Sequence, residues 1–135
     1  MAESVRVQAG RVLKRFGEIR LAYLFGSEAR DEARTTSDVD VAVLADRRLS
    51  LHRYGQICDA LAAALGRRVD LIDLAAAPPL LLRKVIGGGR VLVCQDESKR
   101  LRFETRAIAR FLDTRRLREI QHGYLRKLVE ARRAS

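Results

Sequence analysis

Two aspartates stand two positions apart in the segment Asp38-Val39-Asp40, and they are the residues of this chain best suited to chemistry. Alternate side chains of a strand point to one face, so this spacing predicts neighbouring carboxylates about 6 to 7 Å apart along a strand. Two like charges so close are costly without a cation, and Mg²⁺ is commonly held by a few carboxylates together with substrate phosphates. The pair therefore indicates a site for metal and phosphate, with a solvent-facing acidic edge strand as the alternative.

A Gly-Ser turn, Gly26-Ser27, lies between a predicted strand over 19–25 and a predicted short helix over 28–34. Backbone N–H groups at such a turn and the positive end of the helix dipole favour bound anions. Gly26 permits close approach of the backbone, the Ser27 hydroxyl can donate to a phosphate oxygen, and Arg30 can reach the same anion from one turn along. The turn is therefore a candidate phosphate site, and an ordinary helix N-cap is the simpler alternative.

A third carboxylate would complete a two-metal arrangement, in which paired ions hold the attacking and leaving oxygens of a displacement. The candidate is Asp70, in a strand predicted over 68–73. Asp73 has the opposite parity in the same strand, so it faces the other side and is expected to be a turn or cap acid. The alternative for Asp70 is an exposed acid on a strand.

The elements that must position these residues alternate between strand and helix patterns. Strands are predicted over 19–25, 39–44, 68–73 and 90–94, and helices over 3–16, 51–65, 78–88 and 97–132. Ser50 and Gly66 mark the two ends of the second long helix, and the polar run 113–116 predicts a kink or a break in the last one. This order predicts an α/β (α+β) fold, with helices packed against one mixed sheet and a helical C-terminal tail.

The length of 135 residues and the composition, 47% hydrophobic and 33% charged, predict a single globular domain. The longest apolar stretches, 60–65 and 74–82, fall short of the roughly 20 residues of a membrane helix, and the first residues lack the pattern of a signal peptide. We therefore expect a cytoplasmic protein without a membrane association. Cys58 and Cys94, both in apolar stretches, predict buried thiols rather than a disulfide scaffold.

The charge is strongly basic and unevenly distributed. The chain has 27 basic and 17 acidic residues, a net charge of +10, and residues 96–135 hold 12 of the basic and 6 of the acidic ones. We therefore expect a core over residues 1–95 and a basic helical extension of the same domain over 96–135. Such a charge favours nucleotide binding, RNA binding or docking on an acidic protein. The apolar stripe of the terminal helix suits either packing on the core or docking another protein.

In combination, Gly26-Ser27, ten intervening residues and Asp38-Val39-Asp40 resemble the signature of the DNA polymerase β-like nucleotidyltransferases in their minimal, single-domain form. The resemblance extends to the segments 69–71, 77–81 and 89–92 and to the Arg-rich terminal helix. Among these proteins, the chain most resembles the MntA family of adenylyltransferase antitoxins.

This resemblance implies an enzyme that transfers AMP from ATP, with Mg²⁺ at a two-metal site, to a tyrosine of a partner HEPN-domain toxin, and so silences the RNase activity of that toxin. The residues it assigns to catalysis and to the metals are Asp38, Asp40 and Asp70. The residues it assigns to the triphosphate are Gly26, Ser27 and Arg30. One departure is Asp31, where many relatives have glycine, because an extra acid beside a triphosphate weakens binding unless it points to solvent.

Two other functions fit the same residues. One is a nucleotidyltransferase that acts on RNA or a small molecule, with the basic tail as a grip on nucleic acid. The other is a non-catalytic module that blocks a toxin sterically, against which the intact acids argue. In the tail, Arg116, His122 and Tyr124 resemble the pattern of HEPN nucleases, but about 40 residues cannot supply the helical bundle that such a nuclease needs.

Overall fold

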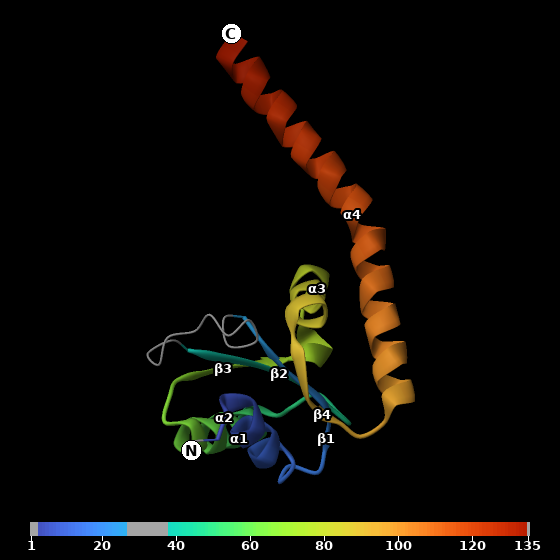
Figure 1. The fold of residues 1–135 in the computed structure, drawn as a ribbon. Coiled ribbons are helices and arrows are strands. Elements are labelled where there is room, and N and C mark those ends of the chain that lie inside the picture. The colour runs from blue at the N-terminus through green and yellow to red at the C-terminus, as the bar shows by residue number, and fades with distance from the viewer. Residues whose placement is uncertain (1–2, 27–37, 135) are drawn as a thin grey trace.

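The computed structural model describes residues 3–26 and 38–134, which form one sheet with helices on both faces and a long terminal helix (Figure 1). The elements are α1 (Val5–Leu13), β1 (Ile19–Phe25), β2 (Val39–Ala45), α2 (Leu51–Leu65), β3 (Val69–Asp73), the 3-10 helix η1 (Leu74–Ala76), α3 (Pro79–Gly88), β4 (Arg90–Cys94) and α4 (Glu97–Ala134). The alternation predicted from the sequence is therefore confirmed. The short helix predicted over 28–34 lies outside the described residues.

The described strands form a mixed sheet in the order β3-β2-β1-β4. β1 runs antiparallel to both β2 and β4, and β2 runs parallel to β3. A parallel pair needs a crossover connection, and α2 supplies it between β2 and β3. As a result β2 and β3 begin at the same end of the sheet, which is also the end at which β1 finishes.

The two faces of the sheet bury different sets of side chains. Alternate residues of β2, namely Val39, Val41 and Val43, are fully buried in the core under α1 and α2. Ala42 points the other way, into a second core with Tyr23 and residues of α3 and α4. Figure 1 shows α1 and α2 on one side of the sheet and α3 on the other. By strand parity, Asp38 and Asp40 share the α3 side with Ala42.

Local signals set most element boundaries where they were predicted. The Ser50 hydroxyl accepts a hydrogen bond from the Arg53 N–H at 3.1 Å and caps α2. Gly66 ends α2 in a left-handed conformation with a φ of 64°. The first helix is shorter than predicted, because it ends at Leu13 rather than at Phe16.

The terminal helix α4 is continuous from Glu97 to Ala134, so of the two alternatives predicted at 113–116, a kink or a break, the break was wrong. The ribbon changes direction part way along (Figure 1), which agrees with the alternative of a kink. Within this helix the Thr114 hydroxyl donates to the carbonyl of Phe111 at 3.1 Å, a side-chain to backbone bond of the kind that bends helices without ending them. The first part of α4 packs beside α3, and the outer part projects beyond the domain.

The remaining global expectations concern membranes and cysteines. Among the helices of residues 3–26 and 38–134, none is both long and apolar enough to cross a bilayer. Cys58 and Cys94 are free thiols, as predicted, but both are half-buried, so the prediction that they are buried was wrong.

Candidate functional site

Two of the three predicted carboxylates lie on adjacent strands in direct register. Asp40 of β2 is the pairing partner of Asp70 of β3 in the parallel ladder, and Val39 pairs with Val69 in the same way. Residues in register on neighbouring strands share a face, and their backbones lie about 4.8 Å apart. Asp38 stands two residues before Asp40, so the same parity brings it to this face. The alternation in the sequence predicted that Asp38 and Asp40 share one face of the sheet, and the strand register places Asp70 beside Asp40 on that face.

The charge at this end of the sheet is uncompensated within the described residues. Asp40 is half-buried, and burial raises the pKa of its carboxyl group first, with the negative charges of Asp70 and then Asp38 raising that pKa further. Asp38 and Asp70 themselves are exposed. Between residues 3–26 and 38–134, no hydrogen bond or ion pair to any of the three carboxylates is found. The site therefore favours a cation.

Gly26 brings the end of β1 directly against this carboxylate. Phe25, the last residue of β1, pairs with Asp40 across the antiparallel ladder. Gly26 follows with a φ of 71°, and a Cβ atom built on it would lie 2.3 Å from Asp40 Oδ2. Only glycine satisfies both the backbone conformation and the close approach. The turn predicted to bind phosphate thus begins beside the carboxylates predicted to bind metal.

The other two predicted residues of this turn, Ser27 and Arg30, lie outside the described residues, and so does Asp31. Among the described residues, the structure places Gly26 and Asp70 each beside Asp40. The assignment of Ser27 and Arg30 to the triphosphate stays a prediction.

The described acids fit a cation that arrives with a ligand better than a closed metal cage. Within residues 3–26 and 38–134, no three acidic, histidine or cysteine side chains converge closely enough to enclose a metal on their own. Mg²⁺ needs no such cage, because it keeps several waters and is usually bound by one or two carboxylates plus substrate phosphates. Asp40 and Asp70, adjacent and unpaired among these residues, match that donor set.

A hollow of about 370 Å³ lies at the opposite end of the sheet, at the start of β1 and of α4. Its lining includes Arg20, Asp46 and Lys99. The Arg20 guanidinium already donates to the carboxylate of Asp46 and, at 2.6 Å, to the side-chain oxygen of Gln95. Because its main cation is held by these partners, we assign no chemistry to this hollow.

The sequence did not reveal a buried link between β1 and α4. The Tyr23 hydroxyl donates to Glu104 Oε1 at 2.6 Å, and Arg100 Nε donates to the same oxygen at 3.0 Å. Burial and the Glu104 carboxylate raise the pKa of Tyr23. The i, i+4 spacing of Arg100 and Glu104 is visible in the sequence, but the strand residue that meets them is not. This link holds α4 to β1, the strand that Gly26 directly follows.

Comparison with known proteins adds a family and several relatives. The family model described as "Polymerase beta, Nucleotidyltransferase" matches residues 8–98, which include the three aspartates and Gly26. The curated protein adenylyltransferase MntA of Shewanella oneidensis strain MR-1 is 37% identical over 75 residues, or 56% of this chain and 54% of that protein. The aligned part thus spans about half the length of the curated relative.

Solved structures extend the likeness over most of the chain. A chain from a toxin-antitoxin complex with AMP-PNP matches with a TM-score of 0.79 and 27% identity, covering 89% of this chain and 97% of that one. A chain from the complex of tri-AMPylated Shewanella oneidensis HEPN toxin with MNT antitoxin matches with a TM-score of 0.71 and 26% identity, covering 90% and 98% of the two chains. The mixed sheet and the long terminal helix therefore recur together.

Proposed function

The chain belongs to the polymerase β nucleotidyltransferase family, and from that premise we propose that it is an antitoxin that transfers AMP from ATP to a tyrosine of a cognate HEPN-domain toxin. The observation that carries the proposal is the in-register pair Asp40 and Asp70 with Gly26 pressed against Asp40. The choice of a HEPN toxin as acceptor is supported by similar chains, since one is named a protein adenylyltransferase and another is bound to an AMPylated HEPN toxin.

The chemistry follows from the residues at this end of the sheet. Asp38, Asp40 and Asp70 would hold Mg²⁺, which when bound neutralises charge on the triphosphate and on the departing pyrophosphate. Gly26 lets the backbone approach Asp40 closely, and we assign Ser27 and Arg30 to the triphosphate oxygens. In this way the chain holds the α-phosphorus of ATP beside the three carboxylates.

The transfer itself forms one bond and breaks another. The tyrosine oxygen of the acceptor bonds to the α-phosphorus, the bond from that phosphorus to the bridging oxygen breaks, and pyrophosphate leaves with the electron pair. A tyrosine hydroxyl has a pKa near 10, so it needs help to lose its proton at neutral pH. We assign that proton to the exposed carboxylate of Asp70, which has room to face an acceptor.

The proposal assigns different roles to the two parts of the chain. Residues 1–95 form the catalytic core, and residues 96–135 form the basic extension of the same domain, which is available to bind a partner.

The proposal also includes a cytoplasmic location. The use of ATP, together with the two free thiols, favours that location.

A transfer assay tests the proposal directly. The chain is mixed with Mg²⁺ and α-labelled nucleoside triphosphates, together with the companion HEPN protein and with total RNA. We expect label from ATP on the HEPN protein. Asp38→Asn and Asp40→Asn should each lower the rate by about 10³-fold or more, whereas Asp59→Asn, an exposed acid of α2, should leave it unchanged.

The other outcomes separate the alternatives. Label on RNA would identify a nucleotidyltransferase of nucleic acid, the function that the net charge of +10 favours as second candidate. Neutralisation of the HEPN protein that survives loss of both aspartates would identify a steric inhibitor. An absence of label on every acceptor would overturn the transferase itself.

A further inference from the structure

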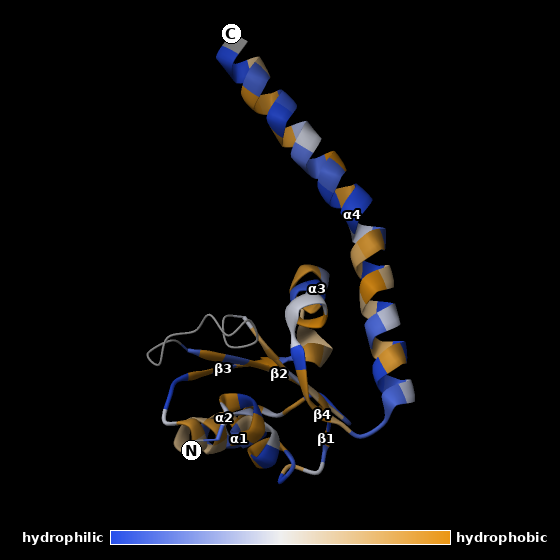
Figure 2. Ribbon diagram, viewed as in Figure 1, coloured by the Kyte–Doolittle hydropathy of each residue, from blue (hydrophilic) through white to orange (hydrophobic). Residues whose placement is uncertain are grey.

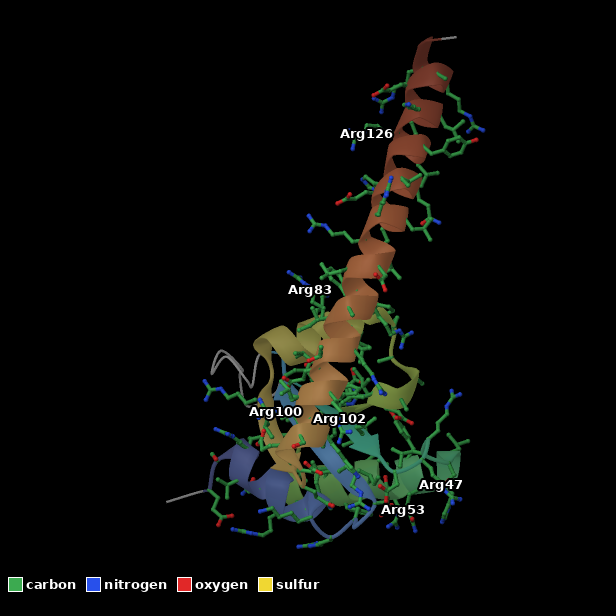
Figure 3. All side chains as sticks on the ribbon, turned by 90° about the vertical axis from the view of Figure 1, so that its right-hand side faces the viewer. Arg47, Arg53, Arg83, Arg100, Arg102 and Arg126 are labelled. Atoms are coloured by element: carbon green, nitrogen blue, oxygen red, sulfur yellow. The ribbon has the colours of Figure 1, made fainter. Side chains whose placement is uncertain are left out.

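The outer part of α4 exposes six large apolar side chains that no other element of the described chain covers. Each of them is between 45% and 64% exposed to solvent. They are Leu117, Ile120, Tyr124, Leu125, Leu128 and Val129. Figure 1 shows this part of the helix projecting beyond the sheet and α3, and Figure 2 shows its apolar residues as orange patches among blue, hydrophilic ones. Figure 3 shows its side chains, Arg126 among them, extending into open space.

Four of these residues form one stripe. Leu117, Ile120, Tyr124 and Leu128 follow one another at intervals of three, four and four residues, which places them on one side of a helix. Such a stripe is the usual signature of a helical face that packs against another apolar surface. We call these four residues the outer stripe.

The outer stripe lies beyond the level at which the first part of α4 packs on the domain. Ala107 is buried and Phe103 is partly buried against the second core, and the Phe111 ring lies between the guanidinium groups of Arg83 and Arg118, at 4.9 and 4.5 Å. Leu117 lies six positions after Phe111 and fourteen after Phe103. At about 100° per residue, Leu117 is turned by roughly 120° from Phe111 but by only roughly 40° from Phe103. The outer stripe is exposed because the outer part of α4 projects beyond the domain, which ends below it.

The outer segment also has little of its own to keep it ordered. Its inner end is fixed by Arg118 on Phe111 and by an ion pair between Arg115 and Glu119 at 3.1 Å. Beyond that level the segment has the length of an isolated helix of 12 to 15 residues, which is only marginally stable in water. Burial of the stripe against a partner would stabilise both the surface and the helix.

Charge selects the kind of partner. Residues 113–134 hold seven basic and three acidic side chains. Arg116 and Lys127 border the outer stripe, and neither forms an ion pair with another described residue. By helical spacing, Glu119 and Glu130 lie toward the opposite side, whereas Asp113, four positions before Leu117, lies at the inner end of the stripe's own side. A second copy of this chain would bring like charges together, whereas a partner with acidic residues beside its apolar face would complement them.

We propose that the outer stripe of α4 is the docking surface for the acceptor protein, which presents to it a helical apolar face bordered by acidic residues. The identity of that acceptor rests on the proposed function, while the surface itself is argued from exposure, spacing and charge. Docking on α4 raises the local concentration of the acceptor near the carboxylates of the sheet, so it favours transfer without any new contact at the reacting atoms.

The test compares a stripe variant with a matched control. The stripe variant carries Leu117→Gln, Tyr124→Gln and Leu128→Gln, and the control carries Leu101→Gln, which replaces an apolar residue of α4 that is 67% exposed and lies outside the stripe. Binding to the companion HEPN protein is measured by titration calorimetry, transfer by label from ATP, and nucleotide binding with AMP-PNP and Mg²⁺. Circular dichroism checks that helix content is retained.

We expect the stripe variant to weaken binding to the HEPN protein by 100-fold or more, on the order expected when several buried anchors are lost. Transfer should fall at low acceptor concentration and recover at high concentration, while AMP-PNP binding stays unchanged. Leu101→Gln should behave as the wild type. The charge-reversed variant, Arg116→Glu with Lys127→Glu, should weaken binding by about 10-fold and remove most of its dependence on salt.

Three results would overturn the inference. They are wild-type binding and transfer by the stripe variant, a chain that is dimeric alone and becomes monomeric in the stripe variant, and a stripe variant that loses affinity for RNA but not for the HEPN protein. Loss of HEPN binding by the stripe variant, with no transfer by the wild type, would support the docking surface and reject the proposed transferase. The two proposals can therefore fail separately.

Discussion

The carboxylate end of the sheet and the outer part of α4 are built by opposite means. At the sheet end, Asp40 and Asp70 come from strands separated by a whole helix in the sequence and are held side by side by the parallel ladder. In the outer part of α4 the stripe is local, since Leu117 and Tyr124 share a face only because of helical spacing. Long-range strand pairing thus fixes the geometry of the carboxylate site. Local periodicity forms an apolar helix face, which is buried only when a partner binds to it.

The two regions also differ in charge and in what each requires. The sheet end is acidic, partly buried and lacks a counter-charge among the described residues, so it requires a cation. The outer part of α4 is basic and exposed, so it requires an acidic apolar surface. The net charge of +10 attracts both a nucleoside triphosphate and an acidic protein. The sheet end therefore lacks positive charge, which a bound cation supplies, and the outer part of α4 lacks an acidic apolar surface, which the partner protein supplies.

The largest expected effect on stability separates the buried core from α4. Leu61 of α2 is fully buried, and Leu128 of α4 is 45% exposed. Leu61→Ala should lower the free energy of unfolding by about 2 to 5 kcal/mol, because it removes buried methyl groups and leaves a cavity. Leu128→Ala should lower it by less than about 0.5 kcal/mol. Urea denaturation measures both, and equal losses would show that the outer part of α4 packs on the domain in solution.

The next effect sharpens the geometry of the sheet end. Gly26 and Gly66 both have positive φ, but a Cβ atom would meet Asp40 Oδ2 only at Gly26, whereas Gly66 has open space. Each change to alanine should cost roughly 1 to 2 kcal/mol of stability through backbone strain. Only Gly26→Ala should also weaken binding of AMP-PNP with Mg²⁺, by about 10-fold or more. Calorimetric titration distinguishes them, and equal affinities would remove Gly26 from the site.

A smaller effect tests the link between the two regions. Tyr23→Phe removes the hydroxyl that donates to Glu104, and it should cost about 1 kcal/mol and speed amide exchange in the first turns of α4. Tyr54→Phe is the matched control, because its hydroxyl donates to the Leu71 carbonyl at 2.6 Å. The control should lose similar stability without a change in α4. Unchanged exchange in both variants would show that α4 is held by α3 alone.

The smallest effect concerns Asp40 in the absence of divalent metal. Burial and neighbouring charge raise its pKa in the folded chain above the unfolded value. The folded chain therefore holds the proton longer, and it loses stability as the pH rises through the interval between the two pKa values. In EDTA at pH 7, Asp40→Asn should be more stable than the wild type by less than about 1 kcal/mol, since the site is partly open to solvent.

This advantage of Asp40→Asn should vanish below the unfolded pKa, where both states of the wild type are protonated. It should also reverse when Mg²⁺ is added, because a cation that the wild type binds stabilises only the wild type. Asp59→Asn provides the control. Thermal unfolding at several pH values measures the difference, and a less stable Asp40→Asn in EDTA would contradict the assigned electrostatics.

Local rules in the sequence determined much of the fold. Alternation of Val39, Val41 and Val43 with acidic and small residues predicted which face of β2 is buried. Ser50 and Gly66 predicted the two ends of α2, because caps and left-handed glycines act within one turn of a helix. The polar run 113–116 predicted a kink or a break in α4, and helix propensity carried the helix through without a break while its direction changes.

By itself, then, the sequence determined the identity of the elements, the face shared by Asp38 and Asp40, and the stripe on the outer part of α4. Only the tertiary structure decided that Asp70 stands in register with Asp40, that Gly26 touches the same carboxylate, and that Tyr23 meets Glu104. The physical reason is the distance along the chain over which each kind of interaction acts. Periodicity and capping act over a few residues, whereas the register of a sheet depends on the packing of strands and helices far apart in the chain.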